Sequence, residues 1–388
     1  MPNRIVYGSG SFQQIGQIVS ELGNKALVIS DSVMKKMNRV KECVVLNEEA
    51  GISTAIYSEV NTEPTDVHVR EAMEICRENN CEVIIAVGGG SCIDTAKAVA
   101  VMMTNDGEIG EYFREKIPFP NKPLPLIAIP TTGGTGSEGT KVTVITDTVN
   151  QVKMMISQPE LLPAVAIVDP LLTLSCPRSI TAATGVDALC HALEAYISRL
   201  KHPVSDMYAL TSIDLITKYL LRAYENGEDI EAREKMSLAA MLAGIAFSNS
   251  SVTLVHGMSR PIGAVFHIPH GFSNAMLLAT VLTFTKDAAV QRFASIGKHI
   301  LDTDDGSDEQ LADEVIQKII KLCNDLDIPN MKKWGIDKES YDIAIPKMAA
   351  DAIASGSPAN NPKVPTQEQI EQLYYNAYEF NYEVEKIH

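Results

Sequence analysis

A segment in the second half of the chain combines a carboxylate and an imidazole at helical spacing. It reads TGVDALCHALE at 184–194, and Asp187 and His191 are four residues apart. On a helix, residues with this spacing share one face. Their neighbours are small or apolar, so a carboxylate and an imidazole buried there need a partner, and a divalent cation would provide one.

A second segment supplies further imidazoles. The stretch VHGMSRPIGAVFHIPHG at 255–271 holds three of the eight histidines of the chain. A lone buried histidine is more often structural than a ligand. The pairing of this segment with the Asp-x3-His pattern nevertheless favours metal binding, with His256 and His270 as the third and fourth ligands. One Asp and three His suit a divalent first-row metal.

A glycine-rich turn in the first half is a possible phosphate site. The apolar run 83–87 leads into GGGSCIDTAK at 88–97, where Ser91 could cap a helix. The glycines would let a phosphate approach the backbone, and the helix N-terminus would offer free N–H groups and a positive dipole end. The alternative is a tight strand-to-helix turn without a ligand.

The segment PTTGGTGSE at 130–138 also follows an apolar run and contains a literal GxGxxG match that begins at Gly134. The match is weak, because no helical period follows it. Hydroxyls and glycines at the end of a strand do suit a ligand crevice in an open α/β sheet. Asp31 ends another strand, where it would bind a ribose and repel the 2′-phosphate of NADP, or else cap the next helix. Lys153 could pair with a phosphate, although a lone lysine is usually solvated surface.

These motifs lie on two kinds of predicted structure. Four continuous apolar runs, at 26–30, 83–87, 126–130 and 164–169, alternate with helical segments and indicate a parallel sheet covered on both faces. From about residue 179 the apolar residues follow a helical period instead. We therefore predict a Rossmann-like α/β dinucleotide-binding domain over 1–175 and an all-helical metal-binding and substrate domain over 176–388.

Composition restricts the function. The 388 residues carry a formal net charge of −16, which argues against nucleic-acid binding. No apolar run is long enough for a membrane helix, and the N-terminus leads into a strand-like run rather than a signal peptide. Seven cysteines, an odd number, indicate reduced thiols and a cytoplasmic protein.

Together, and in this order, the four motifs resemble those of the iron-containing (group III) alcohol dehydrogenase family, and the resemblance covers essentially the whole chain. It implies an NAD-dependent enzyme for small alcohols or aldehydes, assembled as a homodimer or larger, with its active site in the cleft between a dinucleotide-binding and a helical domain. Fe²⁺ is the usual metal of the family, and some members use Zn²⁺. The resemblance implies as metal ligands Asp187, His191, His256 and His270.

The resemblance also assigns the coenzyme site. The pyrophosphate would lie on Gly89, Gly90 and Ser91. The rest of the nicotinamide coenzyme would be lined by Asp94, Thr131, Thr132, Thr135 and Lys153. Asp31 falls where the family uses an acid to prefer NAD over NADP.

One position departs from the family pattern H-G-x-x-H, whose second histidine is thought to relay a proton. Arg260 stands there, and an arginine cannot relay protons at neutral pH. His267 could substitute, or could have a structural role. If the helix continues through Pro261, Arg260 would bind an anionic group of a small aldehyde such as sulfoacetaldehyde. Alternatively, Arg260 pairs with a local acid or with the coenzyme phosphates. Phe247 would line an apolar substrate pocket.

Two other functional classes stay open at this point. Dehydroquinate-synthase-like lyases share the architecture but bind a phosphorylated acid through several cations, of which only Arg260 and Lys153 can be named here. A catalytically silent binding protein is the other alternative, although all four predicted metal ligands are intact.

Overall fold

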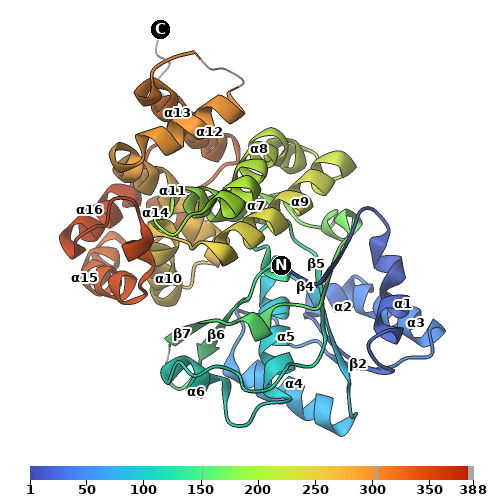
Figure 1. Cartoon of the computed structure of the whole chain (residues 1–388). Helices are drawn as coiled ribbons and strands as arrows, with labels where there is room; N and C mark the ends of the chain where they lie inside the picture. Colours follow the sequence, from blue (N-terminus) through green and yellow to red (C-terminus); the bar gives the residue numbers. More distant parts are fainter. Residues whose placement is uncertain (151, 302–304, 383–388) are drawn as a thin grey trace. The chain divides into compact units, whose positions relative to one another are not determined.

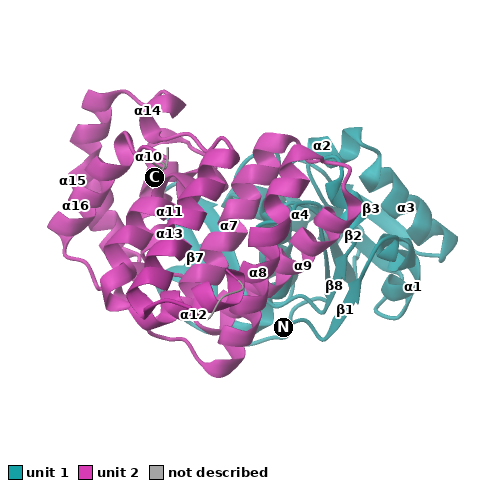
Figure 2. Ribbon diagram, turned by 90° about the horizontal axis from the view of Figure 1, so that it is seen from above, with its two compact units in different colours: residues 1–175 teal, residues 176–388 magenta. Residues whose placement is uncertain are grey.

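The computed structural model of the chain describes residues 1–150, 152–301 and 305–382. The chain forms two compact units, residues 1–175 and residues 176–388, coloured teal and magenta in Figure 2. Each unit has hydrophobic clusters of its own. The packing that positions each group of functional residues can therefore be followed within one unit.

The first unit is built on a six-stranded sheet with the order β1-β8-β5-β4-β2-β3. Figure 1 labels β2, β4 and β5 among these strands. Every neighbouring pair of strands is parallel. The four predicted apolar runs become β2, β4, β5 and β8, so the predicted Rossmann-like sheet is confirmed. The strands of this sheet are β1 Arg4–Tyr7, β2 Lys25–Ile29, β3 Ser53–Tyr57, β4 Val83–Gly88, β5 Leu126–Pro130 and β8 Val165–Val168.

Apolar layers cover both faces of the sheet, because side chains alternate along each strand. Leu27 and Ile84 point into the layer under α4 and α5, whereas Val28 and Ile85 point into the layer under α1 and α3. Each such side chain contributes about 1.5–3 kcal/mol on burial, which makes the sheet a firm base for its loops. The helices of this unit are α1 Ile15–Ser20, α2 Ser32–Lys36, α3 Arg39–Glu49, α4 Asp66–Glu78, α5 Gly90–Met102 and α6 Ile109–Arg114.

Three of the strands lie outside the runs predicted from the sequence. β3 is an edge strand with one buried residue, and β6 (Val142–Asp147) and β7 (Val152–Ser157) form a separate antiparallel hairpin. Buried and half-buried residues alternate along β6, so it lacks the continuous apolar run of a central strand. β6 follows the glycine loop directly. The GxGxxG match therefore leads into a short 3₁₀ turn and a strand, which confirms that no α-helix follows it directly.

The second unit is helical, and no strand occurs among its described residues. The helical period predicted from about residue 179 is confirmed, and it includes the long helices α8 and α9. Every residue of α7 from Gly185 to Ile197 is buried, so this helix forms the centre of the unit. Its helices are α7 Arg178–Ile197, α8 Pro203–Glu225, α9 Ile230–Asn249, α10 Leu254–Phe266, α11 His270–Thr285, α12 Val290–Ile300, α13 Asp308–Asp325, α14 Met331–Trp334, α15 Lys338–Ala354 and α16 Gln367–Tyr378.

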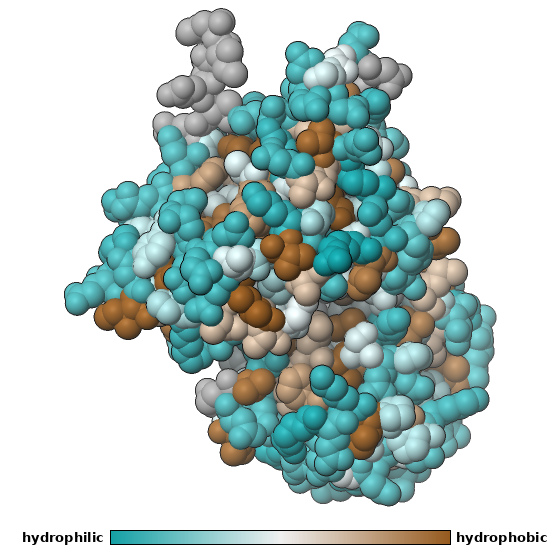
Figure 3. All heavy atoms as spheres, turned by 60° about the vertical axis from the view of Figure 1, so that its left-hand side comes forward, coloured by the Kyte–Doolittle hydropathy of each residue, from teal (hydrophilic) through white to brown (hydrophobic). Residues whose placement is uncertain are grey.

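Surface and core features agree with the composition. Within the described residues, no single helix has the length and apolar character to cross a bilayer; α9 and α10 qualify only as a pair, which bends by 103° at its break. All seven cysteines are free, and only Cys176 is not buried. Figure 3 shows one face of the molecule, on which hydrophilic residues predominate and apolar residues form small groups.

Candidate metal centre and coenzyme turn

Three helices of the second unit bring the predicted metal ligands together. α7 presents Asp187 and His191 on one face, α10 carries His256, and α11 begins at His270. The start of α11 lies close to α7, because a Cβ atom on Gly271 would stand only 2.8 Å from the carbonyl oxygen of Ala183. A larger residue there would push the two helices apart and move the fourth imidazole away.

The ligand atoms of Asp187, His191, His256 and His270 all lie within 4.8 Å of one another. The Nε2 atoms of His191 and His256 are 2.9 Å apart. Two facing ring nitrogens need a proton or a cation between them. Nδ1 of His191 is buried with no hydrogen-bond partner among the described residues. One carboxylate and three imidazoles at this spacing fit a divalent first-row metal.

Burial and neighbouring charges set the protonation of this centre. Burial raises the pKa of Asp187, but the neighbouring His191 and His270 lower it by more. The net pKa of Asp187 is therefore well below the usual range. Burial lowers the pKa of His191 to about 3. Burial also lowers the pKa of His256, but the carboxylate of Glu194 raises it to about 9. An ionised Asp187 and a neutral His191 are the forms that a cation requires.

Glu194 is a buried carboxylate beside the ligands, and the sequence analysis gives it no role. Its Oε1 accepts hydrogen bonds from the hydroxyl of Thr253 at 2.9 Å and from the N–H of Val255 at 2.6 Å. Its Oε2 pairs with Nδ1 of His256. Glu194 therefore holds the first turn of α10 and turns Nε2 of His256 toward the other ligands.

Spacing would have revealed this group. Glu194 follows His191 by three residues on α7, and Asn274 follows His270 by four on α11, so each shares a helix face with a ligand. Asparagine is not among the residue types that usually bind metals, and Glu194 stands at the end of a motif in which Asp187 and His191 already account for the helix face. Asn274 is fully buried, and its amide nitrogen lies beside three of the ligands.

The other predicted residues of the second unit occupy different surroundings. α10 continues through Pro261, so Arg260 stands one turn after His256, and its Nη1 donates to the hydroxyl of Ser357 at 3.0 Å. Burial lowers the pKa of Arg260, and the charge of Glu194 raises it. The ring of Phe247 stacks on His191 with 4.4 Å between centroids.

His267 ends α10 in the left-handed conformation, with φ 54°, and its side chain is exposed. It precedes His270 by three residues. A proton relay through His267 stays a prediction.

In the first unit the two glycine motifs lie side by side. The ends of β4 and β5 pair, with Gly88 opposite Pro130. A Cβ atom on Gly90 would stand 2.7 Å from Cγ2 of Thr135, and one on Gly89 would stand 3.7 Å from Cγ2 of Thr132. The turn and the hydroxyl-bearing loop therefore share one wall, and Gly90 allows their close approach.

This wall lies where the direction of the chain across the sheet reverses. From β2 the chain proceeds outward to β3, then crosses back to β4 and on to β5. Such a switch point leaves a crevice at the carboxyl ends of the strands, where ligands bind in open α/β sheets. Asp31 follows β2 at this point: its Oδ1 accepts from the N–H of Met34 at 2.8 Å, so it caps α2, and its Oδ2 accepts from Sγ of Cys92 at 3.5 Å. The cap leaves its other oxygen directed toward the glycine turn.

The prediction that Ser91 caps α5 is wrong. The helix begins at Gly90, its N-cap is Gly89, and no side chain caps it. The N–H groups of Cys92 and Ile93 bond to the carbonyl oxygen of Gly89, at 3.1 and 3.2 Å. The N–H groups of Gly90 and Ser91 precede this ladder, as at helix ends that bind anions.

Two predicted coenzyme residues are engaged with the protein. The carboxylate of Asp94 accepts from the hydroxyl of Ser137 at 2.6 Å and from the N–H of Val144 at 2.8 Å, so it secures the β6–β7 hairpin. Burial raises the pKa of Asp94. Nζ of Lys153 pairs with Glu63 at 2.5 Å. A coenzyme that used either residue would compete with these partners.

A buried lysine that the sequence analysis does not single out ties α5 to the loop after β5. Nζ of Lys97 donates to the hydroxyls of Ser137 and Thr140, both at 2.8 Å, and to the carbonyl oxygen of Val142 at 2.7 Å. Burial lowers the pKa of Lys97 to about 8 and raises that of nearby Glu138 to about 7. This network fixes the loop beside the glycine turn.

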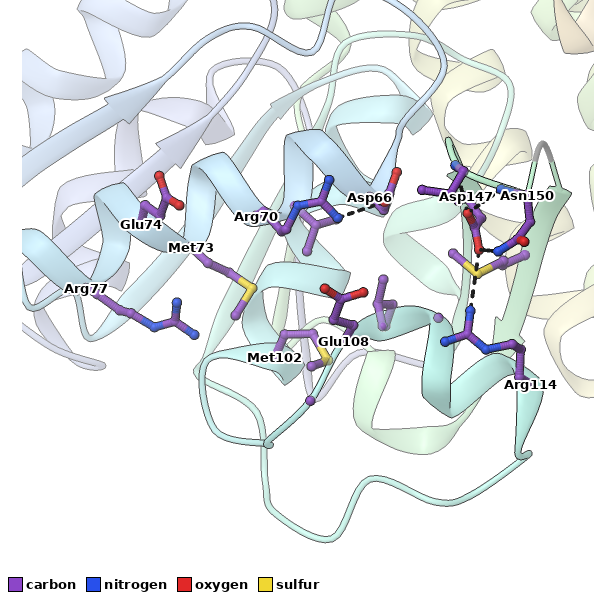
Figure 4. A pocket seen from close by; sticks show the side chains of 16 residues that line it. Asp66, Arg70, Met73, Glu74, Arg77, Met102, Glu108, Arg114, Asp147 and Asn150 are labelled. Atoms are coloured by element: carbon purple, nitrogen blue, oxygen red, sulfur yellow. Dashed lines mark hydrogen bonds and ion pairs between the residues drawn. The ribbon is translucent and has the colours of Figure 1, made fainter.

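A separate cavity of about 470 Å³ in the first unit lies among α4, α6 and the hairpin (Figure 4). Arg70 pairs with Asp66 at 2.8 Å, and Arg114 with Asp147 at 3.5 Å. The residues of the glycine turn do not line it. Two arginines of this cavity are therefore paired with protein carboxylates.

A parallel sheet with a glycine turn at a strand end and a helical unit with an Asp-His₃ cluster suit a protein that binds a nucleotide and a metal. The family model of the iron-containing alcohol dehydrogenases matches residues 2–170, and that of the C-terminal part of the Fe-containing alcohol dehydrogenase family matches residues 181–378. The chain belongs to the iron-containing alcohol dehydrogenase family, and the predicted resemblance is confirmed.

Relatives of the chain match it over nearly its whole length. An NAD-dependent methanol dehydrogenase of Bacillus methanolicus is 35% identical over 97% of this chain and 98% of its own. The crystal structure of a 1,3-propanediol oxidoreductase superposes with a TM-score of 0.93 at 35% identity, covering 97% of this chain and 98% of that one. A sulfoacetaldehyde reductase of Bifidobacterium kashiwanohense, solved with NAD⁺, gives 0.88 at 30% identity, with 98% of both chains covered.

Proposed function

We propose that the protein is an NAD(H)-dependent, metal-dependent alcohol dehydrogenase that interconverts a small alcohol and its aldehyde. The observation that carries this proposal is the convergence of Asp187, His191, His256 and His270 from three helices of one unit. The name of the family and the named activities of its relatives support the same chemistry.

The reaction divides between the two units. An iron or zinc ion held by the Asp-His₃ centre would act as a Lewis acid on the substrate oxygen. The lowered pKa values of Asp187 and His191 favour an ionised carboxylate and a neutral imidazole, the forms that bind a cation. In oxidation the alcohol carbon gives a hydride to C4 of the nicotinamide and the hydroxyl gives up its proton, which yields the aldehyde and NADH; reduction is the reverse.

The first unit would hold the coenzyme. The N–H groups of Gly90 and Ser91 would receive the pyrophosphate, beside the hydroxyls of Thr132 and Thr135. Asp31 would accept hydrogen bonds from the adenosine ribose and repel a 2′-phosphate, which favours NAD over NADP. Thr131, Asp94 and Lys153 remain predicted contacts, the last two with competing protein partners.

A smaller set of substrates, the anionic aldehydes, is the second candidate. Arg260 supports it, because its positive charge reaches the metal centre. Burial is the main cause that lowers the pKa of His191, and the charge of Arg260 lowers it further. The likeness to a sulfoacetaldehyde reductase points the same way. Against it, the guanidinium already donates to Ser357 and interacts with the charge of Glu194, so we favour neutral alcohols.

Arg260→Ala separates these two candidates. If Arg260 binds an anionic group, kcat/KM falls more for acidic aldehydes than for neutral ones. The difference corresponds to about 1.5–3 kcal/mol of transition-state stabilisation, the strength of a hydrogen bond to a charged group. Equal losses on both classes of aldehyde would remove the anionic candidate and leave Arg260 with a structural role.

The main proposal is tested on anaerobically purified protein. Its metal content is measured, and the absorbance of NADH is followed with a panel of small alcohols and aldehydes. We expect activity that a chelator removes and that Fe²⁺ or Zn²⁺ restores. Activity that survives removal of all metal contradicts the proposal. Metal-loaded protein that is silent toward the whole panel would point to the lyase or the binding protein instead.

A further inference from the structure

Asn274 stands at the metal centre without belonging to the predicted ligand set. It lies on α11, one turn after His270, and is fully buried. Its Nδ2 is 2.6 Å from Oδ1 of Asp187, 3.1 Å from Nε2 of His256 and 3.2 Å from Nε2 of His270. One amide group therefore contacts a ligand from each of the three helices.

The short contact with Asp187 fixes the orientation of the amide. Two oxygens 2.6 Å apart would repel each other, so the atom that faces the carboxylate must be the nitrogen, which donates. The carbonyl oxygen on the other side is buried without a partner among the described residues. The oxygen of the amide thus accepts no hydrogen bond among the described residues, whereas its NH₂ group faces the predicted metal ligands.

This arrangement also decides what Asn274 can do toward a cation. An NH₂ group carries partial positive charge and cannot ligate a metal. It can, however, donate to a metal-bound carboxylate and so hold the orientation of that ligand, as groups around metal sites commonly do. The two hydrogens of the amide cannot serve all three neighbours at once, and the shortest contact selects Asp187.

We propose that Asn274 is a positioning residue of the metal centre, which holds the carboxylate of Asp187 in its ligating orientation and keeps α11 in register with α7. This inference rests on the proposed function, since it requires that the Asp-His₃ centre binds a metal. Asn274 complements Glu194: one neutral donor orients the carboxylate, and one buried carboxylate orients His256.

The test compares Asn274→Leu, which keeps the size of the side chain and removes its donors, with Asn361→Leu as a matched control. Asn361 is likewise fully buried in the second unit, with an unpartnered oxygen and a nitrogen that donates to Thr285. Its amide has no described contact with the four ligands. Affinities for Zn²⁺ and Co²⁺ are measured by competition with a chelator, and the visible spectrum of the Co²⁺ form reports coordination.

We expect metal affinity to fall 10- to 100-fold in Asn274→Leu and less than threefold in Asn361→Leu, the usual size of an effect from a group that orients a ligand. The Co²⁺ spectrum should keep its intensity, because no ligand is lost. Unchanged affinity in Asn274→Leu overturns the inference. A spectrum that shows one ligand fewer also overturns it, by making Asn274 a ligand. Failure of the parent protein to bind any metal instead refutes the proposed function.

Asn274→Asp serves if the leucine variant does not fold. It has the same shape but places a second carboxylate against Asp187, so the metal-free form should melt at a lower temperature and gain more on addition of Zn²⁺ than the parent does. Equal losses in the metal-free and metal-loaded forms would show that the amide is only part of the packing and would overturn the inference.

Discussion

Individual side chains in the metal centre work by placing charge where water cannot screen it. Asp187 and Glu194 are both buried beside the candidate cation site. The guanidinium of Arg260 is also near, because the charge of Glu194 raises its pKa. Removing one partner of such a set is costly, because the remaining charge stays buried and uncompensated. The effects of substitutions here should therefore appear in metal affinity before they appear in the fold.

Glu194→Gln tests the carboxylate that orients His256. Glutamine can still accept hydrogen bonds from the first turn of α10, but its amide cannot accept from Nδ1 of His256 while it does so. We expect metal affinity to fall by about 10- to 100-fold, measured by chelator competition. Glu225→Gln, at the exposed end of α8, is the control. An affinity equal to that of the parent would show that Glu194 supports only the helix.

The buried carboxyl of Glu138 gives a pH dependence of stability. Burial raises the pKa of Glu138 from the ordinary range of a glutamate to about 7, so between that range and pH 7 the folded protein holds a proton that the unfolded chain releases. The free energy of unfolding therefore falls as pH rises through this window, by about 1–3 kcal/mol, and the loss is complete above about pH 7.

Glu138→Gln removes this titration, so the variant should gain stability relative to the parent between pH 4.5 and 7.5. Urea unfolding at several pH values measures the difference. Glu115→Gln, an exposed change in the same unit, should follow the parent at every pH. Parallel curves for the parent and Glu138→Gln would contradict the prediction.

Helices and turns act as units in both sites. α7, α10 and α11 each contribute ligands, and their close approach depends on small residues such as Gly271. In the first unit, β4 and α5 are joined by a turn whose glycines lie against the loop after β5. A change to the backbone at Gly271 should therefore weaken metal binding and leave coenzyme binding unchanged, and a change at the glycine turn should do the reverse.

Gly90→Ala tests the turn. The new methyl group would stand 2.7 Å from Cγ2 of Thr135, which forces the loop to move at a cost of about 1–3 kcal/mol. We expect KM for NAD⁺ to rise by about tenfold or more, with metal content unchanged. The double variant Gly90→Ala/Thr135→Ser lacks the clashing methyl group and should recover most of the affinity. Loss of metal in Gly90→Ala would contradict this separation.

The complete chain has two units with separate cores, and each is proposed to bind one of the two cofactors. Ligands stabilise the state to which they bind, by about 2.7 kcal/mol at a hundredfold excess over Kd. The separation of the binding residues along the chain therefore predicts separate patterns of stabilisation.

Hydrogen exchange on the full chain measures these patterns. Addition of Zn²⁺ should protect α7, α10 and α11, because their amides open less often when the ligands are held. Addition of NAD⁺ should protect the β4–α5 turn and the loop after β5. The opposite result, with the metal protecting the glycine turn and leaving α7 unchanged, would refute the assignment of the metal to the second unit.

The sequence by itself determined the features that depend on local periodicity. Continuous apolar runs predicted the central strands, a helical period predicted α8 and α9, and the spacing of Asp187 and His191 placed them on one face of α7. Such patterns depend only on which face of a helix or strand is buried, so they predict the element without showing which other elements pack against it.

Only the tertiary structure decided which distant residues meet. Glu194 reaches across to α10, Asn274 joins three ligands, and Lys97 ties α5 to the loop after β5. The N-cap of α5 is Gly89 and not the predicted Ser91, and the half-buried β6–β7 hairpin is not predicted from the sequence. These contacts depend on how whole elements pack, and helical spacing shows which face a polar residue shares but not which group on another element it meets.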